Sequence, residues 1–297
     1  IRDRCRTMSF SAADLLELLD LEPLERNIYR GRNRDVGTRR IFGGQVLAQA
    51  LVAAQRTVDP DRPVHSMHGY FILAGDLSVP VVYFVDRLRD GGSFTTRRVT
   101  AIQHGEAIFN LSASFHRREP GLEHHIEMPD VPPPEEVRRE LDIIRDRADE
   151  IPSHLRPVMT QDRPLDFRPV EGEDPFESTV REPRRALWVK TVGPLDDNPL
   201  HHRAVLAYAS DYGLIVTALR PHGRSVRDPR MMVASLDHSI WFHRDFRVDD
   251  WLLYVVDAPV AAGGRGFARG TYFTRDGVAV ASVVQEGLIR VRREEPK

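Results

Sequence analysis

The amino-acid sequence predicts an α+β fold in which two antiparallel sheets, each wrapped around a buried helix, are fused in one chain. Its 297 residues fit one duplicated unit, at roughly 100 to 200 residues per domain. A helix rich in small apolar residues, followed by four strand-like segments, occurs on both sides of a proline-rich stretch. These two sets of segments also match each other at a nearly constant offset, which indicates duplication.

The first unit is expected to cover residues 1–116. Residues 43–57, GGQVLAQALVAAQRT, are apolar nearly all round, which is typical of a buried helix. Four segments rich in Val, Ile, Phe and Tyr follow it, separated by Gly-Asp, Gly-Gly and His-Gly turns; they are residues 64–74, 79–86, 94–102 and 107–116. We therefore expect one central helix and a four-stranded meander.

Residues 117–185 are expected to form a proline-rich connector. Of the 21 prolines, 11 fall between Pro120 and Pro183, and proline lacks the N–H group that helices and sheets use. Within the connector, residues 135–150 predict one charged surface helix whose apolar side is formed by Leu141, Ile143 and Ile144.

The second unit is expected to cover residues 186–297 and to repeat the order of the first. Its helix is predicted over residues 200–219, with Asn198 as N-cap and Pro199 at the first helical position. The predicted strands are residues 233–242, 251–257, 267–274 and 278–290.

The two units align motif by motif. VHSMHGYFILAGD from Val64 matches VASLDHSIWFHRD from Val233 at an offset of 169, and VVYFVD from Val81 matches LLYVVD from Leu252 at an offset of 171. Because an unpaired edge strand invites aggregation, we expect the two sheets to join edge to edge.

Composition excludes several function classes. The formal net charge of -2 gives no global field for nucleic acid or an anionic membrane, so we expect neither as a partner. Only Lys190 and Lys297 are lysines, which leaves 42 − 2 = 40 arginines and almost no residue for Schiff-base chemistry. Cys5 is the only cysteine, and no apolar run reaches the roughly 20 residues of a membrane helix, so we expect a cytoplasmic protein.

Duplication supplies an internal control, because a residue that serves only the fold should recur in both halves. Asp211 lies within the apolar run LAYASDYGLIV, and the aligned residue of the first half, at an offset of 166, is Gln45. A carboxylate in a core helix is costly unless it is paired or useful. It is therefore either a functional group, a partner of one of the arginines or partly exposed.

Two further polar residues follow Asp211 in the second half. Ser235 begins the first strand and aligns with Ser66, so this serine recurs and by itself favours a role in the fold. Gln285, in the last strand, aligns with Ala113. Either Gln285 is a surface residue, or Asp211, Ser235 and Gln285 are a functional set kept in the second half alone.

Other chemistries have less support in the sequence. There is no Gly-x-Ser-x-Gly elbow, and the glycine cluster GGRGFARG lacks dinucleotide-binding spacing, so it predicts a turn or bulge. The histidine pairs lack further ligands at zinc spacing, so we expect no metal and no cofactor. His238, next to Asp237, is a candidate for a hydrogen bond in a substrate pocket or in the core.

Seven motifs are spread over nearly the whole chain: RIFGGQVLAQAL, HSMHGYFILAGD, GGSFTTRRVTAIQHGEAIF, RPLDFRPV, LAYASDYGL, SLDHSIWFHR and RGFARGTYFTRDGVAVASVVQEGLIR. Together they resemble one family, acyl-CoA thioesterase II, the TesB-type double hotdog family. The resemblance implies a duplicated hotdog fold and the hydrolysis of acyl-CoA to a free fatty acid and coenzyme A.

The resemblance also implies site residues. The family's catalytic Asp, Ser or Thr, and Gln correspond to Asp211, Ser235 and Gln285; many bacterial members have Thr where Ser235 stands, and serine keeps the hydroxyl. Gly44, Gln45 and His238 are further candidates for substrate binding. We expect Asp211 to activate or orient a water, Ser235 and Gln285 to fix it, and N–H groups near the start of the Asp211 helix to hold the oxyanion.

Arginines are expected to contact the phosphates of coenzyme A, and the resemblance favours a homodimer or homotetramer. Two alternatives remain. A non-catalytic acyl-CoA-binding module would have no need of the Asp211, Ser235 and Gln285 set. An enoyl-CoA hydratase would need a histidine shortly after the aspartate as an acid–base partner, and residues 212–221 contain none.

Overall fold

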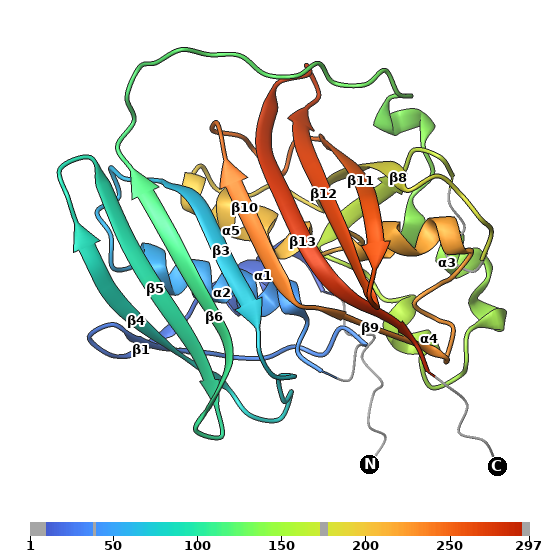
Figure 1. The fold of residues 1–297 in the computed structure, drawn as a ribbon, viewed down its shortest axis with the longest axis horizontal. Helices are drawn as coiled ribbons and strands as arrows, with labels where there is room; N and C mark the ends of the chain where they lie inside the picture. The colour runs from blue at the N-terminus through green and yellow to red at the C-terminus, as the bar shows by residue number, and fades with distance from the viewer. Residues whose placement is uncertain (1–9, 38–39, 173–177, 293–297) are drawn as a thin grey trace.

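The computed structural model describes residues 10–37, 40–172 and 178–292, and their strands form one 13-stranded sheet. The strand order is β1-β2-β4-β5-β6-β3-β10-β13-β12-β11-β8-β7, with β9 paired to β13. The two halves meet where β3 pairs antiparallel with β10, so the expected edge-to-edge junction is confirmed. Figure 1 shows the sheet in front of helices α1, α2 and α5.

In the first half the elements are α1 Ala12–Leu19, β1 Glu22–Glu25, β2 Ile28–Gly31, α2 Gly43–Gln55, β3 Val64–Phe71, β4 Val81–Asp90, β5 Phe94–Gln103 and β6 Glu106–His116. The central helix and the four strands of the meander are present, with ends shifted by a few residues. The sequence did not indicate α1, β1 or β2, because these are short and show no clear alternation. Together β1 and β2 extend the sheet beyond β4.

After β6 the elements are the 3₁₀ turn η1 Pro134–Glu136, α3 Glu140–Asp146, the 3₁₀ turn η2 Ala148–Glu150, α4 Arg156–Met159 and β7 Leu165–Pro169. The single helix expected over residues 135–150 is therefore wrong. The carboxyl end of η1 and the N-cap of α3 have extended backbone, at Val137 and Arg139, which breaks the helix. Leu141 and Ile144 are nevertheless buried.

In the second half the elements are β8 Arg184–Thr191, α5 Pro199–Ser210, the 3₁₀ helix η3 Ile215–His222, β9 Met231–Ser235, β10 Asp237–Phe242, β11 Leu252–Ala262, β12 Arg265–Thr274 and β13 Ala279–Val291. The strand predicted over residues 233–242 is two strands, since β9 pairs only with β13 whereas β10 also pairs with β3. Asn198 caps α5 by accepting a hydrogen bond from the Leu200 N–H, as the sequence predicts.

The helix expected over residues 200–219 ends at Ser210, so its predicted carboxyl end is wrong. Asp211 is the C-cap residue, and Gly213 has φ +74°, a left-handed conformation that side chains other than glycine rarely adopt. The apolar residues that follow belong to η3. Asp211 therefore lies at the end of the helix and not within it.

The hairpins of the two halves have the same register. Arg89 pairs with Thr96 between β4 and β5, and Val260 pairs with Phe267 between β11 and β12. The differences, 260 − 89 and 267 − 96, are both 171. This agreement confirms the duplication and gives a structural alignment that does not depend on residue identity.

Helices α2 and α5 are buried between the sheet and α1, and the two halves share one hydrophobic core that includes Leu47, Leu51, Val205 and Leu206. Burial of such side chains, at about 1.5–3 kcal/mol each, fixes the ends of the two helices relative to the strands. None of the helices among the described residues is long and apolar enough to cross a membrane.

Candidate active site

Three side chains meet at the carboxyl end of α5. The Asp211 carboxylate accepts hydrogen bonds from Gln285 Nε2 at 2.6 Å and from Ser235 Oγ at 3.2 Å, both on Oδ1. Ser235 is the last residue of β9, and Gln285 lies in β13, so three separate elements supply the set. The structure brings Asp211, Ser235 and Gln285 into one hydrogen-bonded cluster.

The first turn of α2 faces the same carboxylate. A hydrogen bond from the Gly44 N–H lowers the pKa of Asp211, and a Cβ atom added to Gly43 would lie 2.6 Å from Asp211 Oδ2. The N-cap residue, Phe42, offers no side-chain acceptor to the first N–H groups of the helix. The positive end of α2, together with a glycine that permits close approach, thus stabilises an anion at this point.

Burial dominates the electrostatics of Asp211. Its side chain is only 5% exposed, and loss of hydration raises the pKa to about 6, against the lowering effect of its hydrogen bonds from Gln285, Ser235 and Gly44. A carboxyl group with this pKa is ionised at neutral pH and is more basic than an exposed aspartate. It can therefore accept a proton from water near neutral pH.

His238 lies behind Gln285 and is fully buried. Its Nε2 is 2.9 Å from Ser210 Oγ, which itself donates to the Ala207 carbonyl, so we assign the ring proton to Nε2. Its Nδ1 then accepts from Gln285 Nε2 at 3.1 Å. Burial lowers the pKa of His238 to about 3, so the ring is neutral and orients the Gln285 amide.

With its nitrogen held by Asp211 and His238, the Gln285 amide has its oxygen, Oε1, available to a ligand. Gln285 Nε2 donates to both Asp211 and His238, whereas the buried Gln285 Oε1 has no hydrogen-bond partner among the described residues. An unmet buried acceptor costs about 1–3 kcal/mol. A water molecule beside Asp211 would satisfy it.

The register of the sheet corrects the alignment of Ser235. Ser235 pairs with Gly287, and Val64 pairs with Phe115. Since 287 − 115 = 172 and 235 − 64 = 171, the counterpart of Ser235 is Val64, and the expectation that the serine recurs as Ser66 is wrong. Gln285 pairs with Ala268, and Ala113 pairs with Arg97. Because Ala268 and Arg97 are again 171 residues apart, Ala113 is confirmed as the counterpart of Gln285.

The alignment of Asp211 with Gln45 is also wrong. Asp211 is the C-cap of α5, and the C-cap of α2 is Arg56, which is therefore its counterpart. Gln45 lies near the start of α2, where its amide bonds to the Arg32 carbonyl, the Asn33 side chain and the Arg34 N–H. We expected oxyanion donors at the start of the Asp211 helix, but Asp211 lies at the opposite, carboxyl end of α5. The helix start that lies beside Asp211 is the start of α2.

Sequence reasoning missed two contributors to the site. Gly43 was not singled out, although the Gly-Gly pair before an apolar helix is the signal that could have revealed it. Tyr212, which follows Asp211, donates to Glu140, and Glu140 also pairs with Arg163 at 3.0 Å. This buried triad ties α3 to the end of α5.

Two cavities lie beside Tyr212, the residue that follows Asp211 in the chain, and both are lined by Tyr212 and Arg163. One, of about 180 Å³, has a mainly apolar wall that includes Phe42, Phe167, Leu165 and Tyr208. The other, of about 250 Å³, is lined by six arginines, Arg163, Arg181, Arg185, Arg220, Arg224 and Arg227. An apolar cavity and an arginine-lined cavity therefore meet at Tyr212 and Arg163. No group of three His, Cys, Asp or Glu side chains suited to a metal ion occurs within the described ranges.

Known proteins resemble the chain along nearly its whole length. Residues 31–116 match the family model for the acyl-CoA thioesterase N-terminal domain, and residues 155–288 match the acyl-CoA thioesterase model. Acyl-coenzyme A thioesterase 8 of Mus musculus is 42% identical over 93% of this chain and 88% of its own length. Acyl-CoA thioesterase 2 of Haemophilus influenzae is 40% identical over 95% of this chain and 99% of its own length.

Solved structures agree with these sequence matches. The crystal structure of acyl-CoA thioesterase II TesB2 from Mycobacterium marinum has a TM-score of 0.77 at 42% identity, covering 93% of this chain and 98% of that one. A hot dog fold protein from Alicyclobacillus acidocaldarius has a TM-score of 0.73 at 20% identity, covering 94% of this chain and 98% of that one, and supports the fold. Because these relatives are 40–42% identical over nearly the whole chain and the architecture is a duplicated hotdog fold, the chain belongs to the acyl-CoA thioesterase family.

Proposed function

We propose that this protein hydrolyses acyl-CoA to a free fatty acid and coenzyme A, using a water molecule activated by Asp211 and held by Ser235 and Gln285. The observation that carries the proposal is the buried Asp211 carboxylate, bonded to Ser235, Gln285 and the start of α2, next to the unpartnered Gln285 Oε1. The thioesterase names of the full-length relatives support the reaction class.

The reaction needs no covalent intermediate on the enzyme. Asp211 takes a proton from water as the water oxygen bonds to the thioester carbonyl carbon, and the carbonyl oxygen becomes an oxyanion. Collapse of this tetrahedral species breaks the carbon–sulfur bond, and the proton held by Asp211 passes to the departing thiolate. The products are the fatty acid and the thiol of coenzyme A.

Each neighbour of Asp211 has a defined part in this mechanism. Gln285 Oε1 accepts a hydrogen bond from the water, and Ser235 Oγ fixes the carboxylate. We assign the oxyanion to first-turn N–H groups of α2, since helix N-termini stabilise negative charge and preorganised donors lower the barrier. His238 touches neither water nor substrate and is a positioning residue for Gln285.

The two cavities beside Tyr212 suggest how the substrate lies. The apolar cavity suits the acyl chain, and the arginine-lined cavity suits the phosphates of coenzyme A, because guanidinium groups bind phosphate in bidentate fashion. The thioester would then sit between them, at Asp211.

Release of free thiol from acyl-CoA of several chain lengths tests the proposal. We expect turnover by the wild-type chain and a loss of at least about 100-fold in folded Asp211→Asn. An absence of thiol release from every acyl-CoA would favour a non-catalytic acyl-CoA-binding protein.

A further inference from the structure

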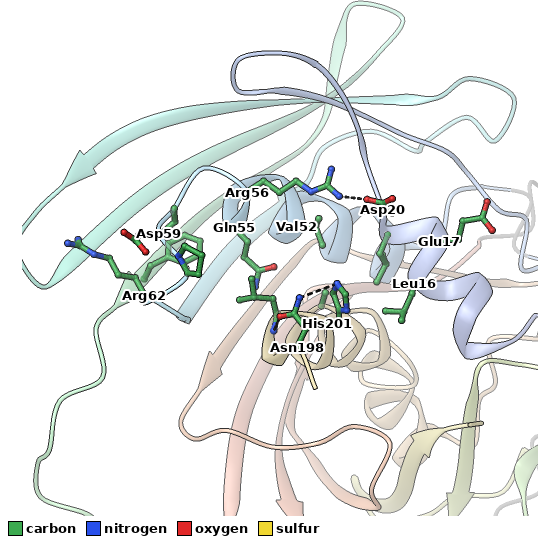
Figure 2. A pocket seen from close by; sticks show the side chains of 16 residues that line it. Leu16, Glu17, Asp20, Val52, Gln55, Arg56, Asp59, Arg62, Asn198 and His201 are labelled. Carbon is green, nitrogen blue, oxygen red and sulfur yellow. Dashed lines mark hydrogen bonds and ion pairs between the residues drawn. The ribbon is translucent and has the colours of Figure 1, made fainter. Parts of the chain in front are cut away.

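A third, larger cavity lies between the carboxyl end of α2 and the start of α5 (Figure 2). Its volume is about 830 Å³, within the range typical of small-molecule sites. Six apolar side chains form much of its wall, Leu16, Leu19, Val52, Phe115, Leu200 and Ala204. None of them belongs to the Asp211 cluster.

In the duplicated fold, this cavity occupies the place in the first half that corresponds to the candidate active site of the second half. Asp211, at the end of α5, faces the start of α2, whereas Gln55, at the end of α2, points toward Asn198 at the start of α5. The first half therefore keeps an acyl-sized space where the second half has its reaction centre.

The cavity lacks the catalytic groups. At the three positions that correspond to Asp211, Gln285 and Ser235, the first half has Arg56, Ala113 and Val64. Arg56 is held by an ion pair with Asp20 and a bond to the Leu21 carbonyl, and because a guanidinium group stays protonated it cannot act as a base. Glu17, Asp20 and Asp59 also line the cavity but are exposed to water, and His201 pairs with Asp196, so a ligand bound here would meet no buried base like Asp211.

The cavity does hold one unmet polar group. Gln55 is 7% exposed, lines the cavity and points from α2 toward Asn198 in Figure 2. Its Nε2 has no hydrogen-bond partner among the described residues. Because a buried donor without an acceptor is costly, this amide calls for an acceptor oxygen, from a carbonyl or a carboxylate group.

We propose that the first-half cavity binds an acyl group without hydrolysing it, with the acyl carbonyl oxygen accepting from Gln55 Nε2 and the alkyl chain against the apolar wall. The inference rests on the proposed function only for the class of ligand, an acyl group. Both the acyl-CoA substrate and the free fatty acid product present this chemistry.

Calorimetric titration of the full chain carrying Asp211→Asn tests the proposal, with decanoyl-CoA and decanoate as the two probes. We expect two sites per chain for at least one probe. Adding Val52→Trp, which fills the cavity, should reduce the count to one, whereas adding the exposed control Val260→Trp should leave two. Binding of decanoate at the second site identifies the product as a ligand, and binding of decanoyl-CoA alone identifies the substrate.

A second variant covers the case in which Val52→Trp fails to fold. Gln55→Leu keeps the volume and removes the donor, so it should weaken the second site about three- to tenfold and leave the first unchanged. A single site for both probes, unaffected by either variant, would overturn the proposal. Thiol release by the wild-type chain is measured separately, so failure of this inference and failure of the proposed function are distinguishable.

Discussion

The two halves of the molecule share their backbone register and differ in the residues around the reaction centre. The β5–β6 ladder shifts register between Ala101 and Ile102, and the β12–β13 ladder shifts between Tyr272 and Phe273, again 171 residues later. Even local irregularities are thus duplicated. Function in this fold resides in a few side chains on a repeated framework.

The contrast is sharper than the sequence alone indicated. None of Asp211, Ser235 and Gln285 has a chemical equivalent in the first half, whereas residue identity had indicated that the serine recurs. The comparison predicts one reaction centre per chain.

The largest effect is expected for Asp211→Asn, because asparagine cannot accept a proton from water. We expect kcat for thiol release to fall by about 10²–10⁴ while the fold is kept. The matched control is Asp257→Asn, which makes the same change at an exposed residue of β11 paired with Arg269. Near-full turnover by a folded Asp211→Asn would remove Asp211 from the mechanism.

Gln285→Ala should lower kcat by about 10- to 100-fold, less than Asp211→Asn, since it removes hydrogen bonds to the water and the carboxylate but not the base. Gln103→Ala is the control from the first half: Gln103 is also buried in a strand but bonds to the Asp76–Val79 turn. A loss for Gln285→Ala that equals or exceeds that for Asp211→Asn would reverse the two roles.

Gly43→Ala tests the close approach of α2. The added Cβ would lie 2.6 Å from Asp211 Oδ2 and about 3 Å from the Phe71 ring, so the carboxylate must shift. We expect kcat to fall about tenfold, with little change in the melting temperature, because a small displacement of a reacting group costs rate. Gly92→Ala, at a position where an added Cβ meets nothing within 4 Å, should be indistinguishable from wild type.

The raised pKa of Asp211 predicts a pH profile. The base is active when ionised, so kcat should rise with pH through about 6 and level off above it. At pH 5 about one molecule in eleven carries the ionised carboxylate, so kcat should be about tenfold lower than its plateau. A profile flat from pH 5 to 8 in the wild type would show that ionisation of Asp211 does not limit the rate.

Most of the framework could be predicted from the sequence because hydrophobic patterns report burial. The meander strands and the α2 helix follow from runs of Val, Ile, Phe and Ala, and turns such as His104-Gly105 mark the ends. The end of α5 could not be predicted in this way, since η3 continues the apolar pattern beyond Gly213. Periodicity does not distinguish a 3₁₀ segment from the helix before it over so short a run.

Asp211, Ser235 and Gln285 were predicted as a set by resemblance and by their polarity in apolar surroundings, and they do form one cluster, but their counterparts in the first half were not predicted correctly. Ser66 aligned with Ser235 by residue identity, although the strand pairing makes Val64, two positions earlier, the counterpart of Ser235. The roles of Gly43 and of the Gln285 side-chain oxygen follow from contacts between elements that are distant in the chain. A sequence pattern carries no direct record of such distances.

The smallest effect is expected for Gln45→Ala, which tests whether the first half contributes to the chemistry. Gln45 is buried at the start of α2, one residue after Gly44, so its position alone would allow a role in substrate binding. Its amide, however, is bonded at both ends to residues 32–34, and glutamine cannot take a proton from water. We therefore expect kcat/KM within about tenfold of wild type, about 1.4 kcal/mol, with a lowered melting temperature from the lost loop contacts. A folded variant that loses more than a hundredfold in kcat/KM would show that the reaction centre draws on Gln45 as well.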